Sequence, residues 1–186
     1  MEQKRLFVAI KIHPGEEFLR LYYQLKKIFQ QEKIKWVEQE NVHLTLKFIG
    51  ETPDYKAEDI VNALYEARLG IMPFNLVLEG MGIFGSSYNP RVIWFGIKED
   101  KQMGNLAQNI FSELELAGFE RDRQNFVPHL TVGRIKEIKD KKRFQEKLDK
   151  IKPGHIQTDR VEEFHLFESI LQPEGPVYKV VETITI

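Results

Sequence analysis

The stretch Asn41-Val42-His43-Leu44-Thr45-Leu46-Lys47-Phe48-Ile49-Gly50 carries the clearest structural pattern in the chain. Apolar side chains occupy every second position from Val42 to Phe48, and the residues between them are His43, Thr45 and Lys47. Successive side chains of a β-strand point to opposite faces, so this alternation predicts a strand with one buried face and one polar face. The polar face is expected to carry His43, Thr45 and Lys47 together.

A second His-Leu-Thr triplet, His129-Leu130-Thr131, begins 86 residues after the first (129 minus 43), in a chain of 186 residues. It lies within a second predicted strand over residues 126–132. Each triplet follows a predicted helix and precedes a further helix and more strands. The repeat therefore indicates a duplicated unit folded into two facing lobes.

The rest of the chain alternates between helical and strand patterns. Apolar residues spaced by three and four predict helices over residues 14–31, 54–69, 101–117 and 140–151. Short apolar or alternating runs predict strands over residues 6–12, 74–84, 91–97, 161–171 and 177–186. Several connections between strands are too short for a helical crossover, so the expected fold class is α+β with mostly antiparallel sheet.

Composition is that of a soluble globular protein, with 42% hydrophobic and 30% charged residues. The chain has no cysteine, which excludes a disulfide framework, a thiol nucleophile and Cys-based metal sites. Neither a signal-peptide core nor a stretch long enough to span a membrane is present, so a cytoplasmic protein without membrane contact is expected. The net charge of −1 gives no strong general attraction to nucleic acid, so any contact with a nucleic acid should be local.

The paired triplets fit acid–base chemistry at a phosphate. Residues i and i+2 of a strand point to the same side, so each His projects together with its Thr. Imidazole titrates near neutral pH, so one ring can accept a proton while the other donates one, and threonine hydroxyls can bind phosphate oxygens. The pair predicts displacement at phosphorus without a metal, since neither triplet has a standard metal-ligand spacing. For either triplet alone, a half-exposed strand remains the alternative.

Further stretches of the chain extend this pattern in order: Arg5-Leu6-Phe7-Val8-Ala9-Ile10, Trp36-Val37, Pro90-Arg91-Val92-Ile93-Trp94, Phe126-Val127-Pro128 with Val132-Gly133-Arg134 around the second triplet, Phe164-His165-Leu166-Phe167-Glu168-Ser169 and Gly175-Pro176-Val177-Tyr178. With these flanks the chain resembles the 2H phosphoesterase superfamily over nearly its whole length. Within that superfamily it is most similar to the RNA 2′,3′-cyclic phosphodiesterases, also named 2′-5′ RNA ligases.

The resemblance implies one domain over residues 1–186, bilobal and pseudo-symmetric, with two mostly antiparallel sheets facing a central cleft and helices on the outside. It implies a monomer that needs no cofactor and hydrolyses RNA 2′,3′-cyclic phosphate ends, such as those of tRNA fragments, to 2′-phosphates. Some relatives also join RNA ends through a 2′-5′ linkage. By the same resemblance His43 and His129 are the acid–base pair, and Thr45 and Thr131 hold the phosphate. His129 is assigned as the base for water and His43 as the acid for the leaving O3′, with the reverse assignment left open.

Arg134 is a further candidate for phosphate contact by resemblance. Strict alternation along the strand puts its side chain on the face opposite His129. It reaches the cleft only if the strand bends or bulges, which Gly133 permits. An exposed arginine at the end of a strand is the alternative.

Three other residues are candidates for contact with a base or the RNA backbone. Phe48 and Trp94 can stack on a base, but both also suit core packing, which is favoured for Phe48. Arg91 can contact the backbone, although an exposed surface role is favoured, and Lys47 is expected only at the rim of the cleft. The remaining histidines, His13, His155 and His165, are not expected to be catalytic.

Other functions remain open at this point. The same site can serve 2′-5′-linked oligonucleotides or small cyclic nucleotide phosphates, because the triplets define the phosphate centre and not the base. A module that binds an RNA end without turnover is an alternative of another class.

Overall fold

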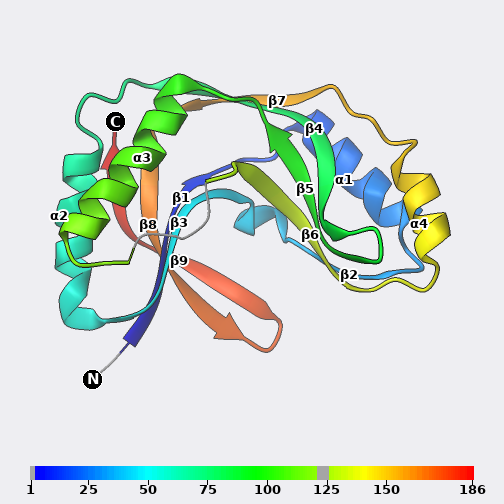
Figure 1. Cartoon of the computed structure of the whole chain (residues 1–186), viewed down its shortest axis with the longest axis horizontal. Helices are drawn as coiled ribbons and strands as arrows, with labels where there is room; N and C mark the ends of the chain where they lie inside the picture. The colour runs from blue at the N-terminus through cyan, green and yellow to red at the C-terminus, as the bar shows by residue number, and fades with distance from the viewer. Residues whose placement is uncertain (1–2, 121–125) are drawn as a thin grey trace.

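The computed structural model describes residues 3–120 and 126–186 and contains two antiparallel sheets (Figure 1). The first sheet has the strand order β3-β1-β8-β9. Its strands are β1 (Gln3–Lys11), β3 (His43–Pro53), β8 (Glu163–Gln172) and β9 (Gly175–Thr185). The first triplet opens β3, next to the central strand β1.

The second sheet has the order β2-β6-β5-β4-β7. Its strands are β2 (Lys33–Trp36), β4 (Phe74–Ser86), β5 (Asn89–Ile97), β6 (His129–Glu137) and β7 (His155–Val161). The second triplet opens β6, next to β5. The two triplets therefore lie on different sheets, and the predicted α+β fold with two antiparallel sheets is confirmed.

Helices cover the outer side of each sheet (Figure 1). On the first sheet, α2 (Ala57–Ala67) packs against α3 (Lys101–Leu116), and these helices contact β9 and β3 respectively. On the second sheet, α1 (Glu16–Ile28) contacts β7, and the ring of Phe29 just after α1 packs on Phe144 of α4 (Lys141–Leu148). Two short 3₁₀ turns, Gln39–Asn41 and Asp54–Lys56, flank β3. No helix in the described ranges is long and apolar enough to cross a membrane.

One hydrophobic core joins the two lobes. It includes Leu6 and Val8 of β1, Ile93 and Phe95 of β5, and Phe18 of α1, all fully buried. The other face of β1 carries Phe7 and Ala9, which form a small separate cluster with Phe167 of β8. Burial of both faces explains why this strand is a continuous apolar run rather than an alternating one.

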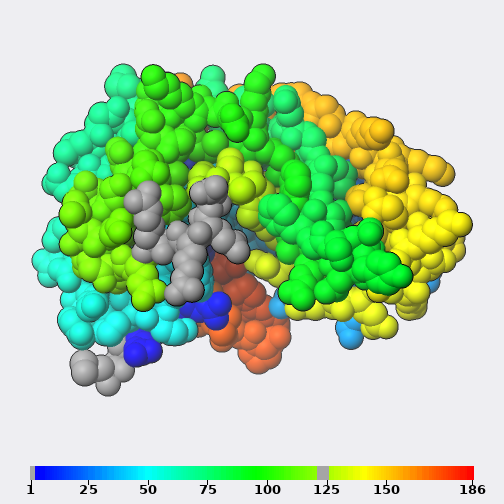
Figure 2. Space-filling model, in the orientation of Figure 1, coloured from blue at the N-terminus to red at the C-terminus, as the bar shows by residue number. Residues whose placement is uncertain are grey.

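The space between the lobes is bounded by the β8–β9 hairpin. In Figure 2 this orange-red hairpin emerges below a recess between the lobes. The Asn41 side-chain amide donates a hydrogen bond to the Pro176 carbonyl oxygen at 3.0 Å, which holds the hairpin beside the start of β3. The first sheet is therefore strongly curled, so that β9 approaches the start of β3 across the two strands between them.

Several predicted boundaries are wrong. The strand β3 continues through Gly50, whose positive φ of 92° keeps a bulged chain paired with β1 as far as Pro53. His155, which no predicted strand included, begins β7. Neither β2 nor β7 was expected from the sequence, because both are short and only part of each is apolar.

Candidate active site

A bulge in β3 decides which side chains share a face with His43. Ala9 pairs with Thr45, whereas Val8 pairs with Lys47, so Leu46 is an extra residue and both Leu46 and Lys47 lie opposite Val8 on the buried side. Lys47 is only 5% exposed, and its ammonium donates to the Glu120 carbonyl at 2.9 Å. The prediction that Lys47 shares the face of His43 is therefore wrong.

The same bulge returns Phe48 to the inner face. Phe48 pairs with Phe7, is 48% exposed and carries the Arg5 guanidinium 5.1 Å from its ring centroid. The expectation that Phe48 packs in the core is wrong, because the extra residue reverses the alternation after Thr45. An exposed aromatic ring on this face is available to stack on a base.

β6 contains the equivalent bulge. Trp94 pairs with Thr131 and Ile93 pairs with Gly133, so Val132 is the extra residue. From the histidine onward, the first seven residues of β3 and β6 share the same order of buried and exposed positions. Arg134 is thus the counterpart of Phe48. It is exposed, pairs with Val92 and lies on the inner face.

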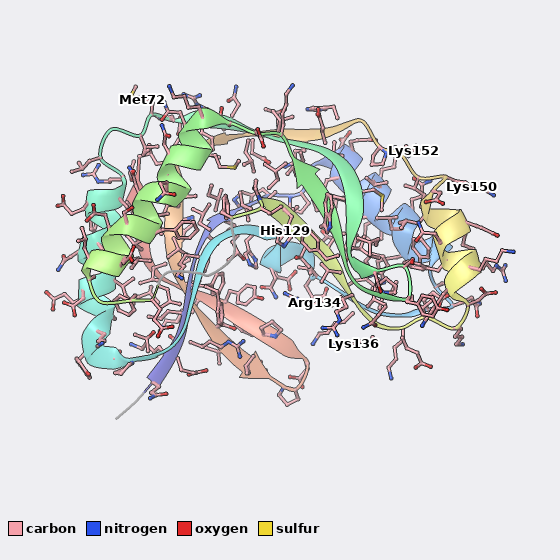
Figure 3. All side chains as sticks on the ribbon, viewed as in Figure 1. Met72, His129, Arg134, Lys136, Lys150 and Lys152 are labelled. Atoms are coloured by element: carbon pink, nitrogen blue, oxygen red, sulfur yellow. The ribbon has the colours of Figure 1, made fainter. Side chains whose placement is uncertain are left out.

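Figure 3 shows His129, Arg134 and Lys136 following one another along β6, with Arg134 in the space between β6 and the β8–β9 hairpin. Burial lowers the pKa of His43 and raises that of Tyr178; the positive charge of Arg134 adds to the first shift and opposes the second. Arg134 therefore lies close to the opposite lobe. The bulge that Gly133 was expected to permit is present, and it directs Arg134 into the cleft.

Each catalytic candidate is held by a backbone carbonyl two residues before it. His43 Nδ1 lies 2.6 Å from the Asn41 oxygen, and His129 Nδ1 lies 2.8 Å from the Val127 oxygen. A carbonyl oxygen only accepts, so Nδ1 of each ring carries a hydrogen. Nε2 is left as the atom that gains or loses a proton in both rings.

Aromatic rings flank the two histidines unequally. His43 lies between Phe7 and Tyr178, each 5.1 Å away between ring centroids, whereas Phe84 packs edge-on against His129 at 4.6 Å. Burial lowers the pKa of His43, its hydrogen bond to Asn41 raises it, and the charge of Arg134 lowers it further. The net lowering favours the neutral imidazole of His43 near pH 7. Residue-by-residue interpretation missed Tyr178, which the sequence marks only within its family-like tail.

The threonines complete the arrangement. Thr45 and Thr131 are half-buried, and neither hydroxyl is hydrogen-bonded within the described part of the chain. β3 and β6 contact each other although they belong to different sheets, and Arg134 of β6 lies close enough to His43 of β3 to act on its pKa. Two imidazoles, two hydroxyls and one guanidinium thus face a common space, which is a suitable donor set for a small anion.

The remaining candidates divide between the cleft and the outside. Trp94 lies on the inner face beside Thr131 and stretches across Gly82, and its buried indole N–H has no partner among the described residues. Arg91 is exposed and sits with the buried Pro90 in a bulge opposite Gly85. The register thus turns Arg91 to the outer side, so the structure does not bring it to the cleft.

Other histidines are engaged elsewhere. His165 is buried on the inner face, with Nδ1 3.0 Å from the Thr183 hydroxyl, and His155 Nε2 lies 2.8 Å from the Thr158 hydroxyl. Burial lowers the pKa of His165. Across residues 3–120 and 126–186, no group of three His, Asp or Glu side chains is placed to hold a metal ion.

Comparison with known families agrees with this geometry. The model of the LigT-like phosphoesterases matches residues 10–94 and 96–178, so each matched segment contains one His-Leu-Thr triplet. The chain belongs to the LigT-like phosphoesterase family. The resemblance to the 2H phosphoesterases drawn from the sequence is thereby confirmed.

Similar proteins match nearly the whole chain. A Methanocaldococcus jannaschii protein named RNA 2′,3′-cyclic phosphodiesterase is 35% identical over 180 residues, covering 96% of this chain and 98% of its own length. An Archaeoglobus fulgidus protein of the same name is 36% identical over 181 residues, covering 94% and 96%. The crystal structure of Escherichia coli LigT complexed with 3′-AMP has a TM-score of 0.81 at 26% identity and covers 100% of this chain and 99% of LigT.

Proposed function

We propose that the protein hydrolyses 2′,3′-cyclic phosphate ends of RNA to 2′-phosphates, with His43 and His129 as its acid–base pair. The observation that carries the proposal is the repeated geometry of the triplets. Each histidine is fixed through Nδ1 by a carbonyl oxygen, and each strand bulges after its threonine on sheets that face one another. The names of the archaeal relatives support an RNA end as the substrate.

The reaction needs two proton transfers and no redox change. Nε2 of one neutral histidine takes a proton from water as the water oxygen attacks phosphorus in line with O3′. The bond from phosphorus to O3′ breaks, and Nε2–H of the other histidine protonates O3′. The products are a 2′-phosphate and a free 3′-hydroxyl. Thr45, Thr131 and Arg134 donate to the phosphate oxygens, on which charge accumulates.

The roles of the two histidines can be separated by their surroundings. Burial against Phe7 and Tyr178 lowers the pKa of His43, which supplies the neutral form that a base requires. We therefore propose His43 as the base and His129 as the acid, the reverse of the assignment made from the sequence.

A substrate with sulfur in place of the bridging O3′ tests this assignment, because a thiolate leaves without a proton. The variant that lacks the acid should recover most of its lost rate on that substrate, and the variant that lacks the base should not. Recovery of His43→Ala would restore the original assignment. Recovery of neither variant would contradict a division into acid and base.

Phe48 and Trp94 are the proposed contacts for the terminal base, because both rings lie on the inner faces. Replacing Phe48 with Ala should raise KM for nucleoside 2′,3′-cyclic phosphates by about tenfold, in line with the loss of one stacking contact. Ribose 2′,3′-cyclic phosphate, which has no base, is the matched control and should not respond. An equal effect on both substrates would remove Phe48 from base binding.

The proposal also requires both lobes to act as one domain, because each lobe supplies one triplet. We propose that a monomer suffices, since every group of the site comes from one chain. The lack of cysteine favours a reducing compartment such as the cytoplasm. Fragments of tRNA ending in a cyclic phosphate are one substrate of this class to compare with unstructured RNA.

The deciding experiment is hydrolysis of RNA bearing a 2′,3′-cyclic phosphate end in the presence of EDTA. The expected product is the 2′-phosphate, and His43→Ala and His129→Ala should each reduce the rate by about a hundredfold or more. Loss of turnover under EDTA would refute the metal-free mechanism, and a 3′-phosphate product would refute the leaving group. Binding without turnover would favour an RNA-end module.

A further inference from the structure

The two sheets are equivalent strand by strand except at one edge. The order β3-β1-β8-β9 corresponds to β6-β5-β4-β7, with each triplet on the first strand. β2 lies beyond β6 and has no counterpart beyond β3. Whatever β2 contributes is therefore specific to one side of the cleft, next to Arg134.

β2 contributes positive charge to the inner face. Lys35 pairs directly with Arg134, so the two side chains lie on the same face. Lys33 pairs with Glu137, and the shift in register beside it makes Lys136 an extra residue, so Lys136 and Glu137 both lie opposite Lys33 on that face and the four cations there outnumber the one carboxylate. In the described chain none of these four cations forms an ion pair with a carboxylate, and all are exposed; we call them the basic strip (Lys33, Lys35, Arg134 and Lys136).

The basic strip leads outward from the reacting centre. Figure 3 shows Lys136 beyond Arg134 along β6, on the side away from His129. Two residues of strand separate Arg134 from Lys136, a distance of about 7 Å. The ammonium of Lys35 lies 3.5 Å from the position that a methyl group would take at Gly175, so this side chain reaches the tip of the β8–β9 hairpin. After Phe48, β3 continues with Ile49, Gly50 and Glu51, whereas β6 continues after Arg134 with Ile135, Lys136 and Glu137, so Lys136 takes the place of Gly50.

We propose that the basic strip binds the RNA backbone on the 5′ side of the reacting nucleotide, so that the preferred substrate is an oligonucleotide rather than a mononucleotide. The inference rests on the proposed function and adds the path that the RNA takes as it leaves the reacting centre. A net charge of −1 gives the whole protein no attraction to RNA, so a local row of unpaired cations beside the phosphate site is what a polyanion would contact. Because β2 adds cations on one side only, it defines the side from which the RNA extends, which the two equivalent triplets do not.

The test compares cytidine 2′,3′-cyclic phosphate with a single-stranded hexaribonucleotide that ends in the same group. The variant Lys33→Gln/Lys35→Gln/Lys136→Gln spares Arg134 and every group of the reacting centre. It should lower kcat/KM for the hexamer by about tenfold or more at low salt and leave the mononucleotide unchanged. The dependence of log KM on log salt should flatten by about two units, since each single-strand phosphate contact contributes about 0.7.

Lys142→Gln/Lys150→Gln/Lys152→Gln is the matched control. It removes the same charge from exposed lysines in and after α4, where Figure 3 shows Lys150 and Lys152 far from His129. This variant should behave as wild type on both substrates. Equal losses in the two triple variants, or equal losses on the two substrates, would overturn the basic strip as a backbone site.

Binding separates this proposal from the proposed function. Fluorescence anisotropy with a hexamer ending in a 3′-phosphate measures affinity without turnover. If wild type hydrolyses neither substrate, the proposed function fails, but weaker hexamer binding by the strip variant would still support the basic strip. If the strip variant binds the hexamer as tightly as wild type does, the basic strip does not hold RNA.

Discussion

Trp94 lies flat across Gly82, and this contact makes Gly82→Ala a sharp probe of the cleft floor. A methyl group at Gly82 would lie 2.3 Å from Cζ2 of Trp94, so the indole must move by about 1.1 Å to regain the 3.4 Å of ordinary contact. Gly82 does not have a positive φ, so alanine adds crowding and no backbone strain. Crowding of this kind costs about 1–3 kcal/mol of unfolding free energy.

The displacement should also reach the reacting centre. Trp94 packs on Phe84 at 5.4 Å between ring centroids, and Phe84 packs on His129 at 4.6 Å. A shift of about 1 Å in a catalytic group can lower the rate by about a hundredfold, so kcat/KM for a cyclic phosphate end should fall well beyond the loss of folded protein.

Urea unfolding and kcat/KM measure the two effects. In a Gly82→Ala background, Trp94→Phe should restore part of the stability, because the shorter ring does not reach the positions of Cζ2 and Cη2. Gly104→Ala is the matched control: Gly104 lies in α3 with no other atom near the added methyl, so stability should rise by about 0.5–1 kcal/mol. If Gly82→Ala is as stable and active as wild type, Trp94 does not lie across Gly82.

Three further outcomes follow from named contacts. Burial lowers the pKa of His43 and of His165 from 6.5. The unfolded chain therefore binds more protons below about pH 6.5, and the unfolding free energy should fall from pH 7.5 to pH 5, less steeply in His165→Asn; a flat urea midpoint would contradict this. Tyr178→Ala should raise the pKa of His43 in an NMR titration and Tyr178→Phe should not, whereas no change in either would remove Tyr178 as a cause of its burial. Asp100 caps α3 by accepting from the Met103 amide, so Asp100→Ala should cost about 1 kcal/mol in thermal unfolding and Asp100→Asn much less.

The fold class could be predicted because its signals are local. Spacings of three and four define the helices, and alternation around His43 and His129 defines the two strands that matter most. β2 gave too little pattern for a prediction, since four residues reading Lys-Ile-Lys-Trp define a strand only when β6 pairs with them. For the same reason, the sequence did not predict that the lysines of the basic strip share one face.

The errors at the site have one physical cause. Strict alternation predicted Lys47 on the same face as His43 and Arg134 on the face opposite His129. Both predictions are wrong, because each bulge adds one residue to its strand and reverses the alternation after it. A bulge is a property of two paired strands, so the sequence of one strand does not locate it. Gly133 was a partial sequence signal for the bulge in β6. The structure shows why glycine suits this position, since a Cβ there would lie 3.0–3.1 Å from the Ile34 and Trp36 side chains. β3 has Lys47 at the equivalent position and gave no such signal.

In-line hydrolysis needs one histidine without a proton on Nε2 and one with it. Two interacting histidines titrate in two steps even in identical surroundings, so a symmetric pair can hold one proton, but symmetry does not decide which ring holds it. The strand bulge and the hydrogen bond of Nδ1 are the same for both histidines, but the side chains next to the two rings differ. Phe7 and Tyr178 bury His43, and Arg134 occupies the place of Phe48. In the proposed mechanism the symmetric frame offers two imidazoles to one phosphate, and the burial of His43 favours its neutral form.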